Sequence, residues 1–228
     1  MRLDRMLAEC GLGTRNEVKK LIRSGEVTVN GVCVRKADTS VDEFNDEVCV
    51  SDEPVLYRKF IYLMLNKPAG YITATEGNVP VVMDLIGEGY RDLFPCGRLD
   101  RDTTGLLLIT NDGQLAHKLL SPKNNVEKEY VVGHRSPLSD ADVKKLESGI
   151  TYGGESYRPA VYHKISELEC SLIIKEGKYH EIKLMFEALG NEVVSLRRVR
   201  MKNLCLDETL RPGEYRELTE EEISELQF

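Results

Sequence analysis

The amino-acid sequence predicts an α+β protein in which a small helix–helix–strand unit precedes a larger unit. The larger unit is expected to be built on a mixed, largely antiparallel β-sheet with flanking helices. Strand patterns outnumber helical ones beyond residue 59, and no repeated strand–helix–strand period appears. The first 50 residues show helical spacing and then a hairpin pattern. A chain of 228 residues has room for one small and one large domain, and we place their boundary between residues 58 and 59.

Two helices and a hairpin are predicted in the N-terminal unit. Apolar residues recur at helical spacing over residues 3–10, which indicates a helix with one buried face. A second helix begins with Thr14 and Glu17, which are spaced as a capping box, and ends at Gly25. The Asn-Gly pair at residues 30–31, between valine-rich segments, favours the tight turn of a hairpin.

The larger unit, residues 59–228, combines strand patterns with a later helix. Mixed charges and a proline within residues 51–59 indicate a short linker in front of it. Continuous apolar runs predict buried strands at residues 60–65 and 106–109, and alternating patterns predict strands at 126–133 and 171–175. Apolar residues at helical spacing over residues 182–189, followed by a glycine, predict a helix.

The composition is compatible with a nucleic-acid partner despite a formal net charge of −7. Residues 207–228 hold eight acids and two arginines, so the rest of the chain is nearly neutral. The six cysteines stand singly, without the paired spacing of zinc or thioredoxin-like sites. No apolar run approaches the ~18 residues of a membrane span, and no secretory leader pattern is present. We therefore expect a cytoplasmic protein without a metal site or a membrane partner.

Two charged segments are candidates for function. Arg15, Lys19 and Arg23 lie four residues apart on one side of the second helix, with Lys20 beside them. Such a row can neutralise nucleic-acid phosphates, although a solvated helix face has the same pattern. The second segment, residues 97–105, carries four charges in five residues directly before a buried strand. Taken alone, this segment favours a salt-bridged turn over a catalytic loop.

Longer matches change this interpretation. Residues 2–50 resemble the alpha-L RNA-binding motif, which has two helices, a basic outer face and a strand ending in Val-Asn-Gly. Residues 97–113, Gly-Arg-Leu-Asp-Arg-Asp-Thr-Thr-Gly-Leu-Leu-Leu-Ile-Thr-Asn-Asp-Gly, are similar to the signature of the ribosomal small subunit pseudouridine synthase A family. Residues 65–71, 127–130 and 176–190 resemble that family's opening loop, its tyrosine-bearing element and its final motif. The resemblance therefore spans nearly the whole chain in order.

The resemblance implies an RNA pseudouridine synthase that acts without a metal or a small-molecule cofactor. It assigns Asp100, rather than Asp102, as the nucleophile, Tyr130 as the residue that stacks on the flipped base, and Lys183 as the cation that pairs with Asp100. The expected substrate is a specific uridine of small-subunit ribosomal RNA, either free or in a pre-ribosomal particle. The protein is expected to act as a monomer. Glu181 and Leu184 depart from the Gln and Arg that relatives often carry.

Further RNA contacts are expected outside the N-terminal helix. The full set of predicted RNA-binding residues is Arg15, Lys19, Lys20, Arg23, Lys67, Arg98, Arg198 and Arg200. Strand alternation would place Arg198, Arg200 and Lys202 on one face.

Alternatives from other classes remain at the level of sequence. One is a non-catalytic RNA-binding or ribosome-assembly factor on the same fold, and another is a hydrolase that pairs Asp100 with Asp102. On spacing alone, Lys183 would form a surface pair with Glu187. The four histidines fit no zinc or triad pattern, so structural or RNA-contacting roles are expected for them.

Overall fold

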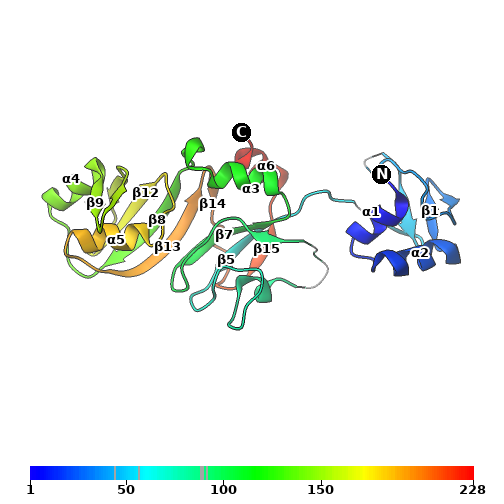
Figure 1. Ribbon diagram of the computed structural model, residues 1–228, viewed down its shortest axis with the longest axis horizontal. Coiled ribbons are helices and arrows are strands. Elements are labelled where there is room, and N and C mark those ends of the chain that lie inside the picture. The colour runs from blue at the N-terminus through cyan, green and yellow to red at the C-terminus, as the bar shows by residue number, and fades with distance from the viewer. Residues whose placement is uncertain (44, 56, 88–89, 91) are drawn as a thin grey trace. The chain divides into compact units, whose positions relative to one another are not determined.

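The computed structural model describes residues 1–43, 45–55, 57–87, 90 and 92–228. The chain divides into two compact units (Figure 1). The smaller comprises Met1–Phe60 with Gly87–Asp92, and the larger comprises Ile61–Ile86 with Leu93–Phe228. Both units combine helices with largely antiparallel sheets, which confirms the predicted α+β class.

The smaller unit packs two helices against a small sheet. Its elements are α1 (Leu3–Glu9), α2 (Arg15–Ser24), β1 (Val27–Val29), β2 (Val32–Cys33), β3 (Val48–Val50) and β4 (Glu53–Pro54), with strand order β2-β1-β3-β4. The predicted capping box of Thr14 and Glu17 is present, and Gly25 ends α2 in the left-handed conformation. The hairpin turn is confirmed as well, because Asn30 and Gly31 both have positive φ angles.

Strand β4 corrects one prediction. Residues 51–59 were expected to form a linker, but Pro54 pairs with Cys49 and Glu53 pairs with Val50 at the edge of the small sheet. Residue 56 lies outside the described residues. A two-residue edge strand leaves almost no alternation to detect, and proline is tolerated there because its missing N–H faces away from the ladder.

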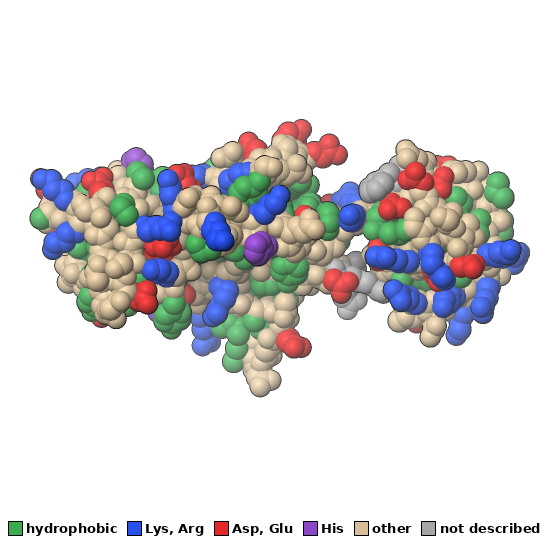
Figure 2. Space-filling view, turned by 45° about the horizontal axis from the view of Figure 1, so that its top comes forward, with side chains coloured by type: hydrophobic (Ala, Val, Ile, Leu, Met, Phe, Trp, Pro, Cys, Tyr) green, Lys and Arg blue, Asp and Glu red, His purple; other side chains and the backbone are tan. Residues whose placement is uncertain are grey.

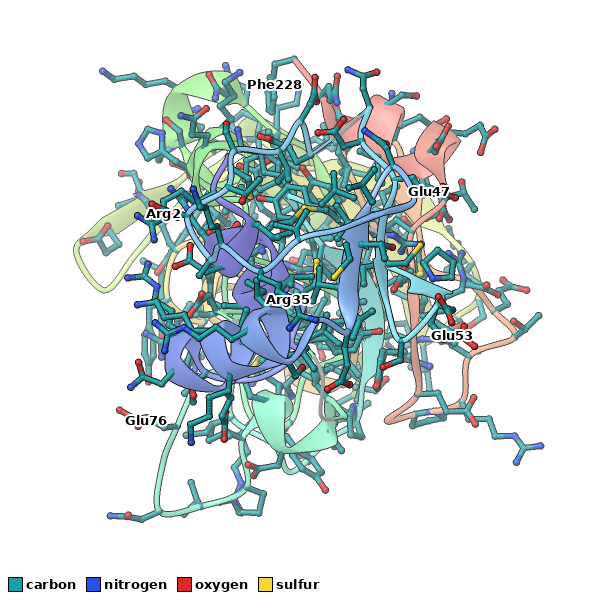
Figure 3. The ribbon with its side chains drawn as sticks, turned by 90° about the vertical axis from the view of Figure 1, so that its right-hand side faces the viewer. Arg2, Arg35, Glu47, Glu53, Glu76 and Phe228 are labelled. Carbon is teal, nitrogen blue, oxygen red and sulfur yellow. The ribbon has the colours of Figure 1, made fainter. Side chains whose placement is uncertain are left out.

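Charge is distributed unevenly over the surface of the smaller unit. Lys and Arg side chains gather along one side of this unit (Figure 2). Arg35 lies beside α2, and its guanidinium donates to the carbonyl oxygen of Arg23 at 2.9 Å. Glu47 and Glu53 lie at the strands instead (Figure 3). The side of the unit that carries α2 is therefore rich in cations.

A single large sheet organises the larger unit. Its strands are β5 (Tyr62–Lys67), β6 (Phe94–Pro95), β7 (Thr104–Thr110), β8 (Lys128–His134), β11 (Val161–Lys164), β12 (Glu169–Ile174), β13 (Val193–Met201), β14 (Leu204–Cys205) and β15 (Tyr215–Glu217). The order is β11-β12-β8-β13-β7-β5-β15, with β14 on β13 and β6 on β7. Neighbours are antiparallel except β7 and β13, which run parallel. A separate hairpin joins β9 (Ile150–Tyr152) and β10 (Glu155–Tyr157).

Helices flank this sheet. They are η1 (Val82–Leu85), α3 (Gly113–Leu120), η2 (Pro122–Asn124), α4 (Asp140–Ser148), α5 (Glu181–Ala188) and α6 (Glu220–Leu226). One apolar cluster joins Leu106 and Leu108 of β7 to Leu119 of α3 and Leu226 of α6, all of them fully buried. The predicted buried strand and the predicted helix near residue 185 are thus confirmed as β7 and α5. None of the described helices is long and apolar enough to cross a bilayer.

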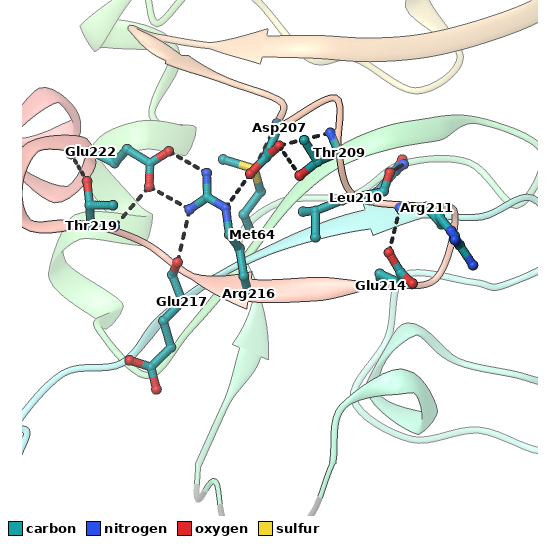
Figure 4. A network of polar contacts seen from close by, with 11 residues as sticks. Met64, Asp207, Thr209, Leu210, Arg211, Glu214, Arg216, Glu217, Thr219 and Glu222 are labelled. Atoms are coloured by element: carbon teal, nitrogen blue, oxygen red, sulfur yellow. Dashed lines mark hydrogen bonds and ion pairs between the residues drawn. The ribbon is translucent and has the colours of Figure 1, made fainter.

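The acidic C-terminal segment packs against the larger unit (Figure 4). Arg216 of β15 donates to Asp207 at 2.6 Å and to both carboxylate oxygens of Glu222 at 2.8 Å. The Thr209 hydroxyl and the Arg216 guanidinium bind Asp207 and lower the pKa of its carboxyl to about 2. This network attaches α6 to the edge of the sheet. Asp207 and Glu222 of the acidic segment therefore stabilise the fold.

Candidate active site

A buried lysine organises the charged loop that precedes β7. Lys67, at the end of β5, is fully buried. Its ammonium donates to the carbonyl oxygens of Asp100 at 3.0 Å, Thr103 at 2.8 Å and Pro68 at 3.1 Å. Burial lowers the pKa of Lys67 to about 8. The residue therefore holds the loop in place and does not offer the exposed cation that the predicted RNA contact requires.

Gly70 of the opening loop and Thr73, which follows it, bind the same charged loop from another side. The Thr73 hydroxyl donates to the carbonyl oxygen of Leu99 at 2.8 Å and accepts from its amide at 3.1 Å. The Gly70 amide donates to the carbonyl oxygen of Arg101 at 2.8 Å, and Arg101 Nε donates to that of Gly70 at 3.1 Å. These bonds fix the backbone on both sides of Asp100.

Asp100 lies beside two cationic or polar groups of the final motif. Lys183 Nζ, on the first turn of α5, is 3.0 Å from Asp100 Oδ2 and 2.6 Å from Asp102 Oδ1. The His180 ring nitrogen Nε2 is 3.5 Å from Asp100 Oδ1. Partial burial opposes the charge of Lys183, but the hydrogen bonds that its ammonium donates to Asp102 and Asp100 outweigh this effect and raise the pKa of Lys183. One ammonium thus serves two carboxylates.

A pocket places Asp100 together with Tyr130 and several apolar side chains. Tyr130 lies on β8, where Lys128, Tyr130 and Val132 share the buried face as alternation predicted. Tyr130 is 7% exposed. The wall also includes Ile174, Ile182 and Leu196. A flat ring that stacks on an aromatic face and presents polar edges to a carboxylate would suit this lining.

The prediction that Arg198 and Arg200 lie on the same face of the strand is wrong. A β-bulge between these residues shifts the register, so Arg198 lies opposite Tyr130 and Arg200 opposite Glu129. Arg198 is 1% exposed and donates through Nε to the Leu106 carbonyl oxygen at 2.8 Å. Arg200 instead forms an ion pair with Glu129 at 2.8 Å. Strand alternation cannot reveal a bulge, because the extra residue has no sequence signature here.

The remaining predicted RNA-binding residues are accessible. Arg15, Lys20, Arg23 and Arg98 are exposed, and Lys19 is half-buried. In the smaller unit the row is partly balanced by acids of α1, since Asp4 attracts Lys19 and Glu9 attracts Arg15.

The sequence predicted no catalytic role for His180. It has a positive φ of 50° at the start of α5, and its ring stacks on Tyr179 with centroids 3.8 Å apart. A non-glycine residue with positive φ is uncommon and marks a functional or strained turn, but such a conformation is invisible in the sequence. Within the described residues, no group of three or more His, Cys, Asp or Glu side chains could hold a metal ion.

Known proteins resemble this chain over its full length. Residues 61–188 match the sequence model of the family described as RNA pseudouridylate synthase, and residues 1–48 match that of the S4 domain. An uncharacterised RNA pseudouridine synthase of Bacillus subtilis is 48% identical, covering 98% of this chain and 97% of its own length. Ribosomal small subunit pseudouridine synthase A of Vibrio cholerae is 43% identical and covers 99% of both chains. A crystal structure of a pseudouridylate synthase covers 100% of both chains with a TM-score of 0.72 and 37% identity.

Proposed function

Because the chain belongs to the ribosomal small subunit pseudouridine synthase A family of RNA pseudouridine synthases, we propose that it converts one specific uridine of small-subunit ribosomal RNA to pseudouridine. It acts as a cytoplasmic monomer on the RNA or on a pre-ribosomal particle. The observation that carries this proposal is the pocket that holds Asp100, with Lys183 at 3.0 Å from its carboxylate and Tyr130 in the same lining.

Asp100 acts as the nucleophile of an internal isomerisation. The bond between N1 of uracil and C1′ of ribose breaks, and a bond between C5 and C1′ forms. C5 loses a proton and N1 gains one, so the reaction needs neither an oxidant nor a reductant. Attack by Asp100 on the base or on the ribose starts this sequence. Lys183 pairs with the carboxylate, and this ion pair becomes stronger when the substrate displaces water from the pocket.

Tyr130 receives the target base. Its ring stacks on the extruded uracil. Tyr130 lines the same pocket as Asp100, and its hydroxyl would assist proton removal from C5. Ile182 and Leu196 supply an apolar wall for the opposite side of the base. Extruding the uridine costs a few kcal/mol of stacking, which contacts elsewhere on the RNA must offset.

The N-terminal unit supplies those contacts. We assign residues 1–58 as the RNA-binding domain and residues 59–228 as the catalytic domain. Arg15, Lys19 and Arg23 form a basic row on α2, and Lys20 extends it. Exposed cations of this kind neutralise phosphates and carry most of the affinity for RNA. Arg98, which lines the catalytic pocket, adds a contact there, and Arg200 adds one beside Glu129, away from that pocket.

Incubation of the full chain with transcribed small-subunit ribosomal RNA tests the proposal. Pseudouridine mapping at single-nucleotide resolution is expected to find one modified position and no released uracil. Released uracil would instead identify the hydrolase in which Asp100 and Asp102 act as paired carboxylates. Tight RNA binding without any modified position would identify the non-catalytic factor.

A further inference from the structure

We propose that a second pocket, which shares Tyr130 with the candidate active site, binds one phosphate group of the RNA substrate. We call it the cationic pocket, and its charged lining consists of Arg98, Lys128, Lys175, Glu176, Lys178 and Arg198. It has a volume of about 400 Å³. The identification of the phosphate as part of RNA rests on the proposed function, whereas the anion site itself does not.

Two of these cations are buried on one face of the sheet. Lys128 is 6% exposed and Arg198 is 1% exposed. Arg198 lies directly opposite Tyr130 in the ladder of β8 and β13, and Lys128 precedes Tyr130 by two residues on the same face. Burial lowers the pKa of Lys128 to about 8, and repulsion by the like charge of Arg198 adds to this effect. Two cations this deeply buried normally require an anion.

Within the described residues, neither cation forms an ion pair with a carboxylate. Lys128 Nζ donates only to carbonyl oxygens, those of Glu176 at 2.8 Å and Val126 at 3.3 Å. Arg198 Nη2 is buried and has no hydrogen-bond partner within the described chain. The Glu176 carboxylate is 3.3 Å from Arg158 and 4.0 Å from Lys178. Glu181 is the buried acid that attracts Lys128, and burial raises the pKa of its carboxyl.

A phosphate group matches what is missing. Guanidinium and ammonium groups are the usual protein donors to phosphate oxygens, and a phosphate offers several acceptors at once. The exposed cations Arg98 and Lys178 at the pocket lining would attract a polyanion toward the buried pair. Tyr130 also lines the active-site pocket. An RNA strand whose uridine occupies the active-site pocket would therefore have a backbone phosphate close to the cationic pocket. The pocket would thereby position the strand for base extrusion.

Inorganic phosphate tests the anion site on the full chain. Thermal unfolding is followed with and without phosphate for the parent, for Lys128→Met and for Lys164→Met, which removes an exposed lysine of β11 as a control. Phosphate is expected to raise the Tm of the parent and of Lys164→Met, since a ligand that binds the native state stabilises it. Lys128→Met should lose that increase. If Lys128→Met does not fold, Lys178→Met, on an exposed residue, should show a smaller increase than the parent. Equal increases in all folded proteins would overturn the site.

Salt titration of RNA binding identifies the source of the phosphate. Loss of one contact to single-stranded RNA should reduce the slope of log affinity against log salt by about 0.7 in Lys128→Met. Lys164→Met should keep the parental slope, and inorganic phosphate should weaken RNA binding by the parent. A parental slope in Lys128→Met would show a site for free phosphate only and overturn the RNA assignment. A parent that makes no pseudouridine, but whose phosphate response disappears in Lys128→Met, would refute the proposed function and leave the anion site intact.

Discussion

Replacing Lys183 by methionine removes the shared cation of the candidate active site and keeps the length of its side chain. Lys183 Nζ is 3.0 Å from Asp100 and 2.6 Å from Asp102. The side chains of Lys183 and Asp100 are 24% and 27% exposed, so this contact is partly shielded from solvent, whereas Asp102 is 71% exposed. A charged hydrogen bond is worth about 1.5–3 kcal/mol, and the exposed contact to Asp102 adds little.

A loss of about 2 kcal/mol of transition-state stabilisation corresponds to a rate roughly 30-fold lower, since each 1.4 kcal/mol is tenfold. Single-turnover pseudouridine formation on transcribed ribosomal RNA measures this rate. Glu187→Gln is the matched control one helical turn further along α5, and it should retain the parental rate. If Lys183→Met and Glu187→Gln both turn over like the parent, Lys183 is only a surface residue and the argument fails.

The difference in free energy of unfolding between the parent and Lys183→Met should depend on pH. The folded-state pKa of Lys183 is raised above 10.5. The stabilisation that it contributes is therefore fully present below the unfolded value and is lost as pH rises through the folded value. Urea denaturation should give a constant difference between parent and Lys183→Met from about pH 6 to 9, which shrinks above about pH 10.5. A difference that is already absent at pH 7 would contradict the ion pair.

Three further predictions concern other parts of the chain. Replacing the basic row by alanine should flatten the salt dependence of RNA affinity by about 0.7–0.9 log units per lost phosphate contact, and an unchanged slope would exclude this helix from the interface. Gly105→Ala should lower the free energy of unfolding, measured by urea denaturation, by more than about 2 kcal/mol. Its φ is +98°, and an added Cβ would lie 2.2 Å from a carbonyl oxygen of β13. Gly113→Ala, whose Cβ meets no atom within 4 Å, is the control, and similar urea midpoints for the two variants would refute the clash. Asp207→Asn should remove the part of the free energy of unfolding that the parent loses between about pH 4 and pH 2. That stabilisation is present above the unfolded pKa of 3.8 and disappears as pH falls through the folded value of about 2. An acid-denaturation profile like that of the parent would contradict the network around Arg216.

Local patterns in the sequence predicted the elements that depend on neighbouring residues. The capping box of Thr14 and Glu17 and the turn at Asn30 and Gly31 formed as expected, because both motifs satisfy backbone groups within a few residues. Strand β7 was equally clear, since a strand buried on both faces reads as a continuous apolar run. Local patterns cannot identify a reaction. The family resemblance, which full-length relatives confirm, identified the class of enzyme.

Features that depend on distant contacts were missed. Lys67 is a lysine beside a proline in the sequence, and its burial follows from carbonyl oxygens about 36 residues further along the chain. The bulge after Arg198 depends on how β13 pairs with β8, so alternation alone misplaced Arg200. His180 approaches Asp100 only because α5 and the charged loop meet in the folded chain. In each case, tertiary structure determines the position of a side chain whose type the sequence already showed.

The measurement that bears most directly on the central claim compares Asp100→Asn with Asp102→Asn in single-turnover pseudouridine formation. The amide keeps the shape of the carboxylate but cannot act as the charged nucleophile. Both variants should fold and bind ribosomal RNA like the parent. Asp100→Asn is expected to form no pseudouridine, whereas Asp102→Asn, whose carboxylate is largely exposed, should retain appreciable activity. An active Asp100→Asn protein would contradict the account.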